Sequence, residues 1–296
     1  MQFKKIARLL MVVSASFTAI DSFAGETQPI SVAQSAVQLQ EIRNATVKIT
    51  YADTTFLIDP MLSKKGTYPG FKNTYRSELR NPLVDLPMST DDVLAGVDAV
   101  IVTHTHLDHW DDAAQQLIPK NIPLFAQNQS DAEIIRKQGF KDVRILDGHT
   151  VFGGVTLSKI GGQHGTDKMY AAPMVAQLLG EAMGVVFQSP QHKTLYLAGD
   201  TIWRPEVDQA LAQFKPEIIV LNAGYARLTG FDDSIIMGKD DVLKASKLMP
   251  KSKVVAVHMD AINHMSLSRK ELKQFVHANR IDSHVAIPQD GESLKF

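Results

Sequence analysis

Short runs of apolar and β-branched residues recur along most of the chain, and Gly, Pro, Asp or Asn bounds each run. This punctuation is typical of strands. It predicts strands at Thr46–Tyr51, Thr55–Ile58, Ala99–Thr103, Pro123–Ala126, Val143–Leu146, Val155–Ile160, Gly184–Gln188, Thr194–Ala198, Ile218–Leu221, Val254–Val257 and Val285–Ile287.

Apolar residues with helical spacing occur between sets of these strands. They predict helices at Asp111–Leu117, Asp131–Gln138, Pro205–Phe214, Asp240–Leu248 and Arg269–Asn279. Two of the starts have the pattern of a capping box, Ser130 with Glu133 and Ser268 with Glu271. Gly139 is placed to end the second helix.

The order of elements favours an α/β (α+β) fold rather than a doubly wound parallel sheet, in which strand and helix alternate more strictly. We expect two mixed sheets packed together with helices outside. The absence of a long linker or repeat in the sequence predicts one domain over 45–296, preceded by a polar lead-in at 25–44. Residues 61–90 are rich in Gly and Pro and predict a long loop, a feature that is usually functional or mobile.

The first 24 residues have the pattern of a secretory signal peptide. Lys4, Lys5 and Arg8 precede a mostly apolar stretch, and Ser22 and Ala24 are the small residues of a cleavage site after Ala24. The apolar stretch is shorter than the roughly 20 residues of a membrane span. We therefore expect a periplasmic or secreted protein with no stable membrane span once the signal is removed.

Composition excludes several classes of protein. Of 296 residues, 44% are hydrophobic and 21% are charged, which is ordinary for a globular chain. The formal net charge of −1 offers no basic excess for general nucleic-acid binding. The absence of cysteine removes disulfide scaffolds, thiolate metal sites and thiol nucleophiles.

One stretch carries the clearest chemistry, the sequence His-x-His-x-Asp-His directly after the predicted strand at Ala99–Thr103. His104 and His106 are two residues apart, so they point the same way if the chain is extended. Asp108 and His109 follow where the chain turns toward a helix. Imidazole and carboxylate ligands without thiolate suit zinc, and also iron or manganese.

Three further potential ligands occupy the same kind of position, at or just past the end of a predicted strand. They are His164, Asp200 and His258. Each alone is more often a structural residue. Their shared position with the His-x-His-x-Asp-His cluster predicts a metal site on one rim of the fold.

With these motifs the chain resembles the metallo-β-lactamase-fold hydrolases, and within them the lactonase-like and phosphodiesterase-like branch that includes ascorbate-6-phosphate lactonase-type proteins. The resemblance also includes Leu57-Ile-Asp-Pro60, Gln163-His164-Gly165 and Leu197-Ala-Gly-Asp-Thr201, and it covers about residues 45–291. It implies a four-layer αββα sandwich with a shallow two-metal rim.

The resemblance also implies a role for each ligand. His104, His106 and His164 would bind the first metal, Asp108, His109 and His258 the second, and Asp200 would bridge them, while Asp59 would support the ligand loop. His264 could replace His258 or touch the substrate. We prefer His258 as the ligand because it ends a strand, and we place His264 with Asp108 and Asp200 as a candidate catalytic residue.

The expected activity is hydrolysis of a small ester-type molecule, a lactone, phosphodiester or thioester, by a hydroxide generated between two divalent ions, zinc in preference to Mn²⁺ or Fe²⁺. A β-lactamase-type amide hydrolase and a non-catalytic metal-binding or interaction protein are the alternatives. Tyr225 is either an oxyanion donor or a core residue. The sequence predicts a small-molecule substrate and leaves the oligomeric state open.

Overall fold

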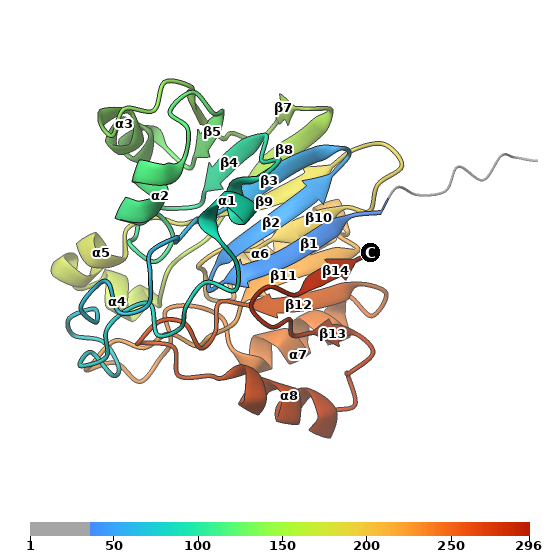
Figure 1. Ribbon diagram of the computed structural model, residues 1–296. Coiled ribbons are helices and arrows are strands. Elements are labelled where there is room, and N and C mark those ends of the chain that lie inside the picture. Colours follow the sequence, from blue (N-terminus) through green and yellow to red (C-terminus); the bar gives the residue numbers. More distant parts are fainter. Residues whose placement is uncertain (1–35) are drawn as a thin grey trace, which may run out of the picture. The chain divides into compact units, whose positions relative to one another are not determined.

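The computed structural model describes residues 36–296, and the predicted signal peptide lies outside them. Two seven-stranded mixed sheets make up the centre of this part of the chain, and helices lie on their outer faces (Figure 1). The predicted fold class is therefore confirmed. No helix within residues 36–296 is both long and apolar enough to cross a membrane.

The first sheet has the strand order β14-β1-β2-β3-β4-β5-β6. Neighbours from β14 to β3 run antiparallel, and those from β3 to β6 run parallel. The strands are β1 (Gln38–Arg43), β2 (Thr46–Tyr51), β3 (Thr54–Ile58), β4 (Ala99–Val102), β5 (Leu124–Ala126), β6 (Val143–Ile145) and β14 (Ser293–Lys295).

The second sheet, in the order β13-β12-β11-β10-β9-β8-β7, repeats this division into a parallel and an antiparallel half. Its strands are β7 (Thr150–Phe152), β8 (Val155–Gly161), β9 (Met183–Gln188), β10 (Leu195–Leu197), β11 (Ile218–Asn222), β12 (Lys253–Val257) and β13 (Val285–Ala286).

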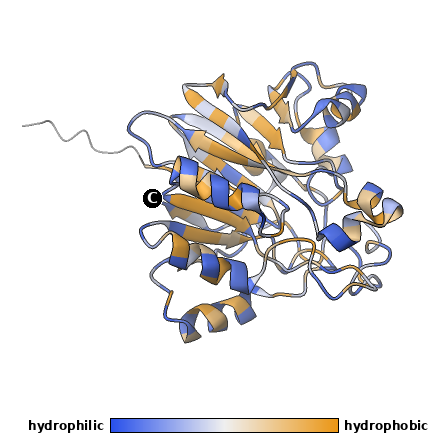
Figure 2. Cartoon of the chain, turned by 180° about the vertical axis from the view of Figure 1, so that it is seen from behind, coloured by the Kyte–Doolittle hydropathy of each residue, from blue (hydrophilic) through white to orange (hydrophobic). Residues whose placement is uncertain are grey.

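Most helices lie outside both sheets, and an amphipathic pattern explains their placement. In Figure 2 apolar and polar positions alternate along the helices, while the strands behind them are mostly apolar. The helices are α1 (Thr90–Leu94), α2 (Asp112–Leu117), α3 (Gln129–Lys137), α4 (Asp167–Tyr170), α5 (Pro173–Leu179), α6 (Pro205–Phe214), α7 (Lys239–Leu248) and α8 (Arg269–Ala278).

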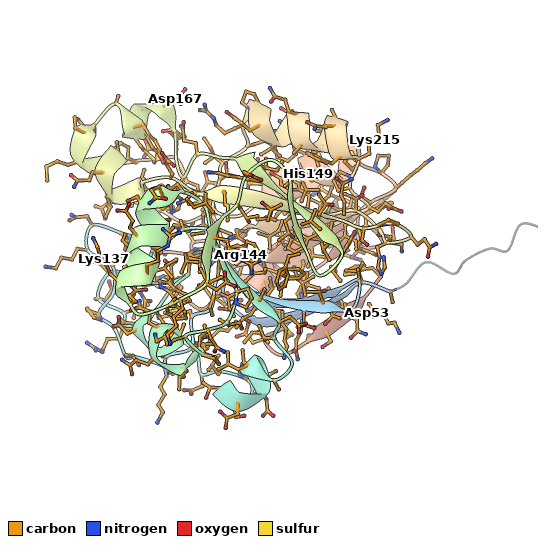
Figure 3. All side chains as sticks on the ribbon, turned by 90° about the horizontal axis from the view of Figure 1, so that it is seen from above. Asp53, Lys137, Arg144, His149, Asp167 and Lys215 are labelled. Carbon is orange, nitrogen blue, oxygen red and sulfur yellow. The ribbon has the colours of Figure 1, made fainter. Side chains whose placement is uncertain are left out.

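Alternate residues of the strands face different apolar layers. In β11, Ile218 and Val220 belong to the core between the sheets, whereas Ile219 and Leu221 pack beneath the outer helices. This is the two-residue period of a strand that is buried on both faces. Many charged side chains lie on the outer surface, as those of Lys137, Asp167 and Lys215 do in Figure 3.

The local prediction misses the short elements α1, α4, α5, β7 and β14, and two of its further details are wrong. Residues 38–43 form β1, so the folded domain begins before the predicted boundary at residue 45. Helix α3 begins after Asn128, whose side chain accepts a hydrogen bond from the Asp131 backbone, and not at a Ser130–Glu133 capping box. The capping box of Ser268 with Glu271 is confirmed.

The long segment between β3 and α1 contains no strand or helix, as its composition predicts. In Figure 1 it lies on the left of the sandwich, at the side where α4 and α5 also lie. Residues from this segment, from α5 and from the loop after β12 line a single pocket. The fold thus gathers its irregular connections around one site.

Candidate metal centre

The seven residues predicted as metal ligands lie together, although they come from both sheets. Their donor atoms form three overlapping groups within which all atoms are less than 4.8 Å apart. These groups are His104 with His106 and His164, Asp108 with His109 and His258, and His104 with His109 and Asp200. The group that contains Asp200 shares His104 with the first group and His109 with the second. Asp200 therefore lies between these two groups, where a ligand that bridges two ions would have to lie.

The positions of these residues follow from the strands that precede them. His104 comes shortly after β4, Asp200 shortly after β10, and His258 directly after β12. Because the carboxyl ends of these strands face the same rim, short polar continuations converge there. His258 has a φ of 64°, so the chain leaves the extended conformation of the strand at this residue.

Hydrogen bonds fix which ring nitrogen of each histidine remains free. His109 Nδ1 donates to Asp59 Oδ2 at 2.9 Å, and His164 Nδ1 donates to the Ile235 carbonyl at 2.9 Å. Both rings therefore present Nε2 to the centre of the cluster. Such a bond on the far nitrogen is the usual way in which a protein orients a metal-binding histidine.

The other rings are fixed in the same way. His106 Nε2 donates to the Leu178 carbonyl at 3.0 Å, which leaves its Nδ1 free. Thr103 Oγ1 donates to Asp59 at 2.6 Å, so its lone pair accepts from His104 Nδ1 at 3.2 Å. The remaining His104 Nε2 is buried without any hydrogen-bond partner. A buried nitrogen left free in this way fits a metal ligand.

Asn44 is a residue that the sequence analysis missed. Its side-chain nitrogen donates to the Asp108 carbonyl at 2.8 Å, so its oxygen accepts from His258 Nδ1 at 2.6 Å. Asn222 similarly donates to Asp200 Oδ1 at 2.6 Å. Asn44 lies 214 residues from His258, and Asn222 lies 22 residues from Asp200, so neither contact follows from a short motif.

The electrostatics of the cluster also fit bound cations. Burial lowers the pKa of His104 well below its usual value and that of His106 to about 4, so both rings are neutral and able to bind a metal. Burial also lowers the pKa of His109, but the carboxylates of Asp200, Asp108 and Asp59 outweigh it and raise the pKa well above its usual value. The position between His109, Asp200 and His258 thus attracts positive charge.

The distances among His109, His258 and Asp200 also support a cation site between these residues. His109 Nε2 lies 3.2 Å from His258 Nε2 and 3.1 Å from Asp200 Oδ2. Because each ring donates through Nδ1, the two Nε2 atoms and the Asp200 carboxylate converge at this point. A metal ion can take the place of the proton that the raised pKa of His109 otherwise holds here, so the residues present fit a metal.

His264 and Tyr225 lie in different places. The buried ring of His264 packs edge-on against Phe71 with 5.3 Å between ring centroids, and it lines the pocket beside Asp108 and His164. It belongs to none of the three ligand groups. Tyr225 is 39% exposed and lines a separate groove with Tyr75, so it is neither a core residue nor part of this pocket.

The pocket next to the cluster has a volume of about 280 Å³ and is mostly apolar. The hydrophobic side chains in its wall are Phe71, Leu107, Leu178, Leu179, Leu228 and Ile235. His106, Asp108, His164 and His264 line it as well, so the apolar space opens directly onto the candidate ligands. A cavity with this lining suits a small molecule with an apolar substituent.

The chain is similar to known proteins over most of its length. Residues 54–259 match the family described as "Beta-lactamase superfamily domain". UPF0173 protein YddR of Bacillus subtilis is 46% identical over 260 residues, which cover 88% of this chain and 100% of the relative.

Two solved structures have the same fold. A possible metal-dependent hydrolase from Veillonella parvula is 52% identical with a TM-score of 0.87. An isothiocyanate hydrolase from Delia radicum gut bacteria is 47% identical with a TM-score of 0.85. Each comparison covers 88% of this chain and 99% of the other.

Proposed function

The chain is a metal-dependent hydrolase of the beta-lactamase superfamily, and we propose that it uses two divalent ions, zinc in preference to Mn²⁺ or Fe²⁺, to hydrolyse a small electrophile with an apolar substituent. The proposed ligands are those with the hydrogen-bonded orientations described above. They are His104, His106 and His164 for one ion, Asp108, His109 and His258 for the other, and Asp200 for both.

Bound ions of this kind supply an acidified water and positive charge for a developing anion. The protein's own residues orient the reactants. Asp108 lies at the boundary between the ligand cluster and the pocket, where its carboxylate can accept a proton from the attacking water. His264, with an Nδ1 that has no hydrogen-bond partner, faces the same space and is proposed to contact the substrate.

The apolar pocket that opens onto the ligands is the observation that carries the substrate proposal. An isothiocyanate fits it, because the group is small and uncharged and commonly carries an alkyl or aryl substituent. Water adds to the central carbon, the carbon–nitrogen bond breaks, and the nitrogen takes up both protons of the water. The products are a primary amine and carbonyl sulfide. The relative that is named an isothiocyanate hydrolase supports this choice.

An uncharged ester-type substrate, a lactone or a thioester, is the second candidate. The position of Asp200 between the two ligand groups favours such a substrate. In the lactonase-like branch that this chain resembles, a carboxylate between the two metals accompanies the hydrolysis of esters of this kind. A phosphodiester is less suited, because Lys72 is the single basic side chain, histidines aside, among the residues that line the pocket. Apart from the two proposed metal ions, the pocket wall offers no other cation to pair with a phosphate.

We also propose that the chain is exported and that its leader is removed after Ala24. The basic start, the short apolar stretch and the small residues before the proposed cleavage site support this.

A substrate panel with metal-loaded protein tests the proposed activity. It contains alkyl and aryl isothiocyanates, a lactone, a thioester, a phosphodiester and a β-lactam. We expect amine release from isothiocyanates, its loss on chelation, and its recovery on adding zinc. Val276→Ala, which shortens a buried side chain of α8, is a control for general destabilisation. Undiminished turnover in protein shown to contain no metal would refute the proposal.

A further inference from the structure

The wall of the apolar pocket includes part of the long segment between β3 and α1, which has no regular structure of its own. Phe71 and Thr74 contribute to the pocket from this segment. The backbone makes only isolated bridges here, Tyr68 with Asn81 and Thr74 with Leu228. Side-chain contacts must therefore supply much of what holds this wall over the ligand cluster.

Asn263 supplies most of these contacts, although it does not line the pocket itself. Its Oδ1 accepts from the Phe71 backbone at 3.1 Å and from Asn81 Nδ2 at 2.8 Å. Its Nδ2 donates to Thr74 Oγ1 and to the Tyr75 carbonyl, both at 2.8 Å. Every donor and acceptor site of the side-chain amide is occupied, and the residue is fully buried.

The backbone of Asn263 is held by the same segment. Its N–H donates to Asn81 Oδ1 at 2.8 Å, and its carbonyl accepts from Arg76 Nε at 3.0 Å. Arg76 also donates to the Met265 carbonyl, so it bonds on both sides of His264. Because His264 packs against Phe71, the wall and the candidate substrate-contacting histidine are fixed as one unit.

We infer that Asn263 is a positioning residue that holds Phe71, Thr74 and His264 over the metal cluster and so determines how well the pocket binds the apolar substituent of the substrate. The inference rests on the proposed function for the identity of the substrate. Nothing in it requires Asn263 to contact substrate or metal. Its amide acts through Phe71 and Thr74, whose contact with an apolar group excludes water.

The effect on substrates should depend on the size of the substituent. A phenethyl group fills apolar space that a methyl group leaves empty, and the favourable free energy of burial scales with apolar area. Loosening the wall should therefore raise KM for phenethyl isothiocyanate more than for methyl isothiocyanate. A purely structural role, by contrast, would lower the activity toward both substrates by the same factor.

The test compares Asn263→Ala, Arg76→Ala and the control Val276→Ala, each metal-loaded, with the wild-type protein. In Asn263→Ala we expect unchanged metal content and a loss of kcat/KM about tenfold greater for the phenethyl than for the methyl substrate, mainly through KM. Arg76 is only half-buried, so Arg76→Ala is expected to fold and to show the same trend more weakly. Val276→Ala should show no such difference between the substrates.

Amide hydrogen exchange gives a readout that does not depend on activity. Backbone amides of residues 66–82 should exchange about tenfold faster in Asn263→Ala than in the wild-type protein. The increase should be smaller in Arg76→Ala, and Val276→Ala should exchange these amides at the wild-type rate. Wild-type protein that hydrolyses no isothiocyanate would refute the proposed substrate, while exchange would still decide the positioning role. Unchanged exchange in both variants, or equal activity losses for the two substrates, would overturn the inference.

Discussion

Asn44 and His258 hold each other by two hydrogen bonds, one between side chains and one between backbones. Asn44 Oδ1 lies 2.6 Å from His258 Nδ1, and the His258 N–H donates to the Asn44 carbonyl at 2.8 Å. Both residues have left-handed backbones, with φ of 66° and 64°. A turn between β1 and β2 in one sheet thus orients a candidate ligand at the end of a strand in the other.

Removing the Asn44 amide should weaken metal binding at the second proposed site. Asn44→Ala leaves His258 Nδ1 without its acceptor and the Asp108 carbonyl without a donor. We expect zinc affinity at that site to fall by about 10- to 100-fold, the usual effect of losing such a bond. Competition with a chromophoric chelator measures it. Asn279→Ala, at the exposed end of α8, is the matched control, and equal affinities in both variants would contradict the assignment.

Metal counting separates the roles proposed for His258 and His264. His258→Ala removes an inner ligand, so the second metal should be lost from the purified protein. His264→Ala should retain both ions and lose activity, because that ring faces the pocket. Two ions in the first variant and one in the second would reverse the assignment.

Replacement of Asp200 should affect both ions together. Its Oδ2 lies 3.1 Å from His109 Nε2 and 3.6 Å from His164 Nε2, which belong to different proposed sites. Asp200→Ala is expected to lower total metal content and to reduce activity by at least about 100-fold, since a ligand to both ions is removed. Elemental analysis with steady-state assays measures both effects. Loss of one ion with the other fully retained would show that Asp200 does not bridge.

Glu41 predicts a pH dependence of stability that is independent of the metal centre. Burial raises its pKa well above the usual value, although Arg269 partly opposes this. A carboxyl whose pKa is raised by folding stabilises the protein fully below its unfolded pKa, and this contribution is lost as pH rises through the folded pKa.

Glu41→Gln should therefore become more stable relative to wild type as pH increases from about 4.5 to 8. We expect the difference in free energy of unfolding to shift by at least about 1 kcal/mol over this range. In the variant Arg269 still pairs with Asp290, so the loss of stability that does not depend on pH, from removing the Glu41–Arg269 pair, stays small. Urea unfolding at several pH values measures the shift, and a difference that stays constant or moves the other way would refute it.

The export proposal is tested by the N-terminus of the protein made in a bacterial host. We expect a mature chain that begins at Gly25 in the periplasmic or secreted fraction, because signal peptidase cleaves after the small residue Ala24. N-terminal sequencing of fractionated cells provides the measurement. A soluble cytoplasmic protein that retains residues 1–24 would show that they are not a signal.

Much of the fold follows from local sequence. Every predicted strand and helix is present with small differences at the ends, since apolar periodicity and bounding Gly or Pro residues are local signals. Strand β1 was missed because it contains Glu41 and Arg43, which suggest a polar segment. Both are buried through partners far along the chain: Glu41 bonds to Arg269, and Arg43 bonds to the carbonyls of Met61, Ser63 and Val84.

For the candidate site as well, the sequence indicates some residues and not others. The positions of His104, Asp200 and His258 at strand ends are readable from the sequence, and the structure brings these residues together. The residues that orient them are not readable. Asn44 acts on His258 and Asn263 acts on Phe71 across nearly two hundred residues or more, so only the folded chain reveals these contacts.

Because the candidate ligands extend from His104 to His258 and come from both sheets, the cluster can exist only after the two sheets have docked. Metal would then bind the native chain more tightly than the unfolded one, which keeps only the local His-x-His-x-Asp-His ligands, and this difference couples metal supply to the folding equilibrium. At a free concentration one thousand times the dissociation constant, a single ion adds about 4 kcal/mol to the free energy of unfolding. The resistance of this protein to heat or protease would then vary with the supply of the divalent metal that it binds.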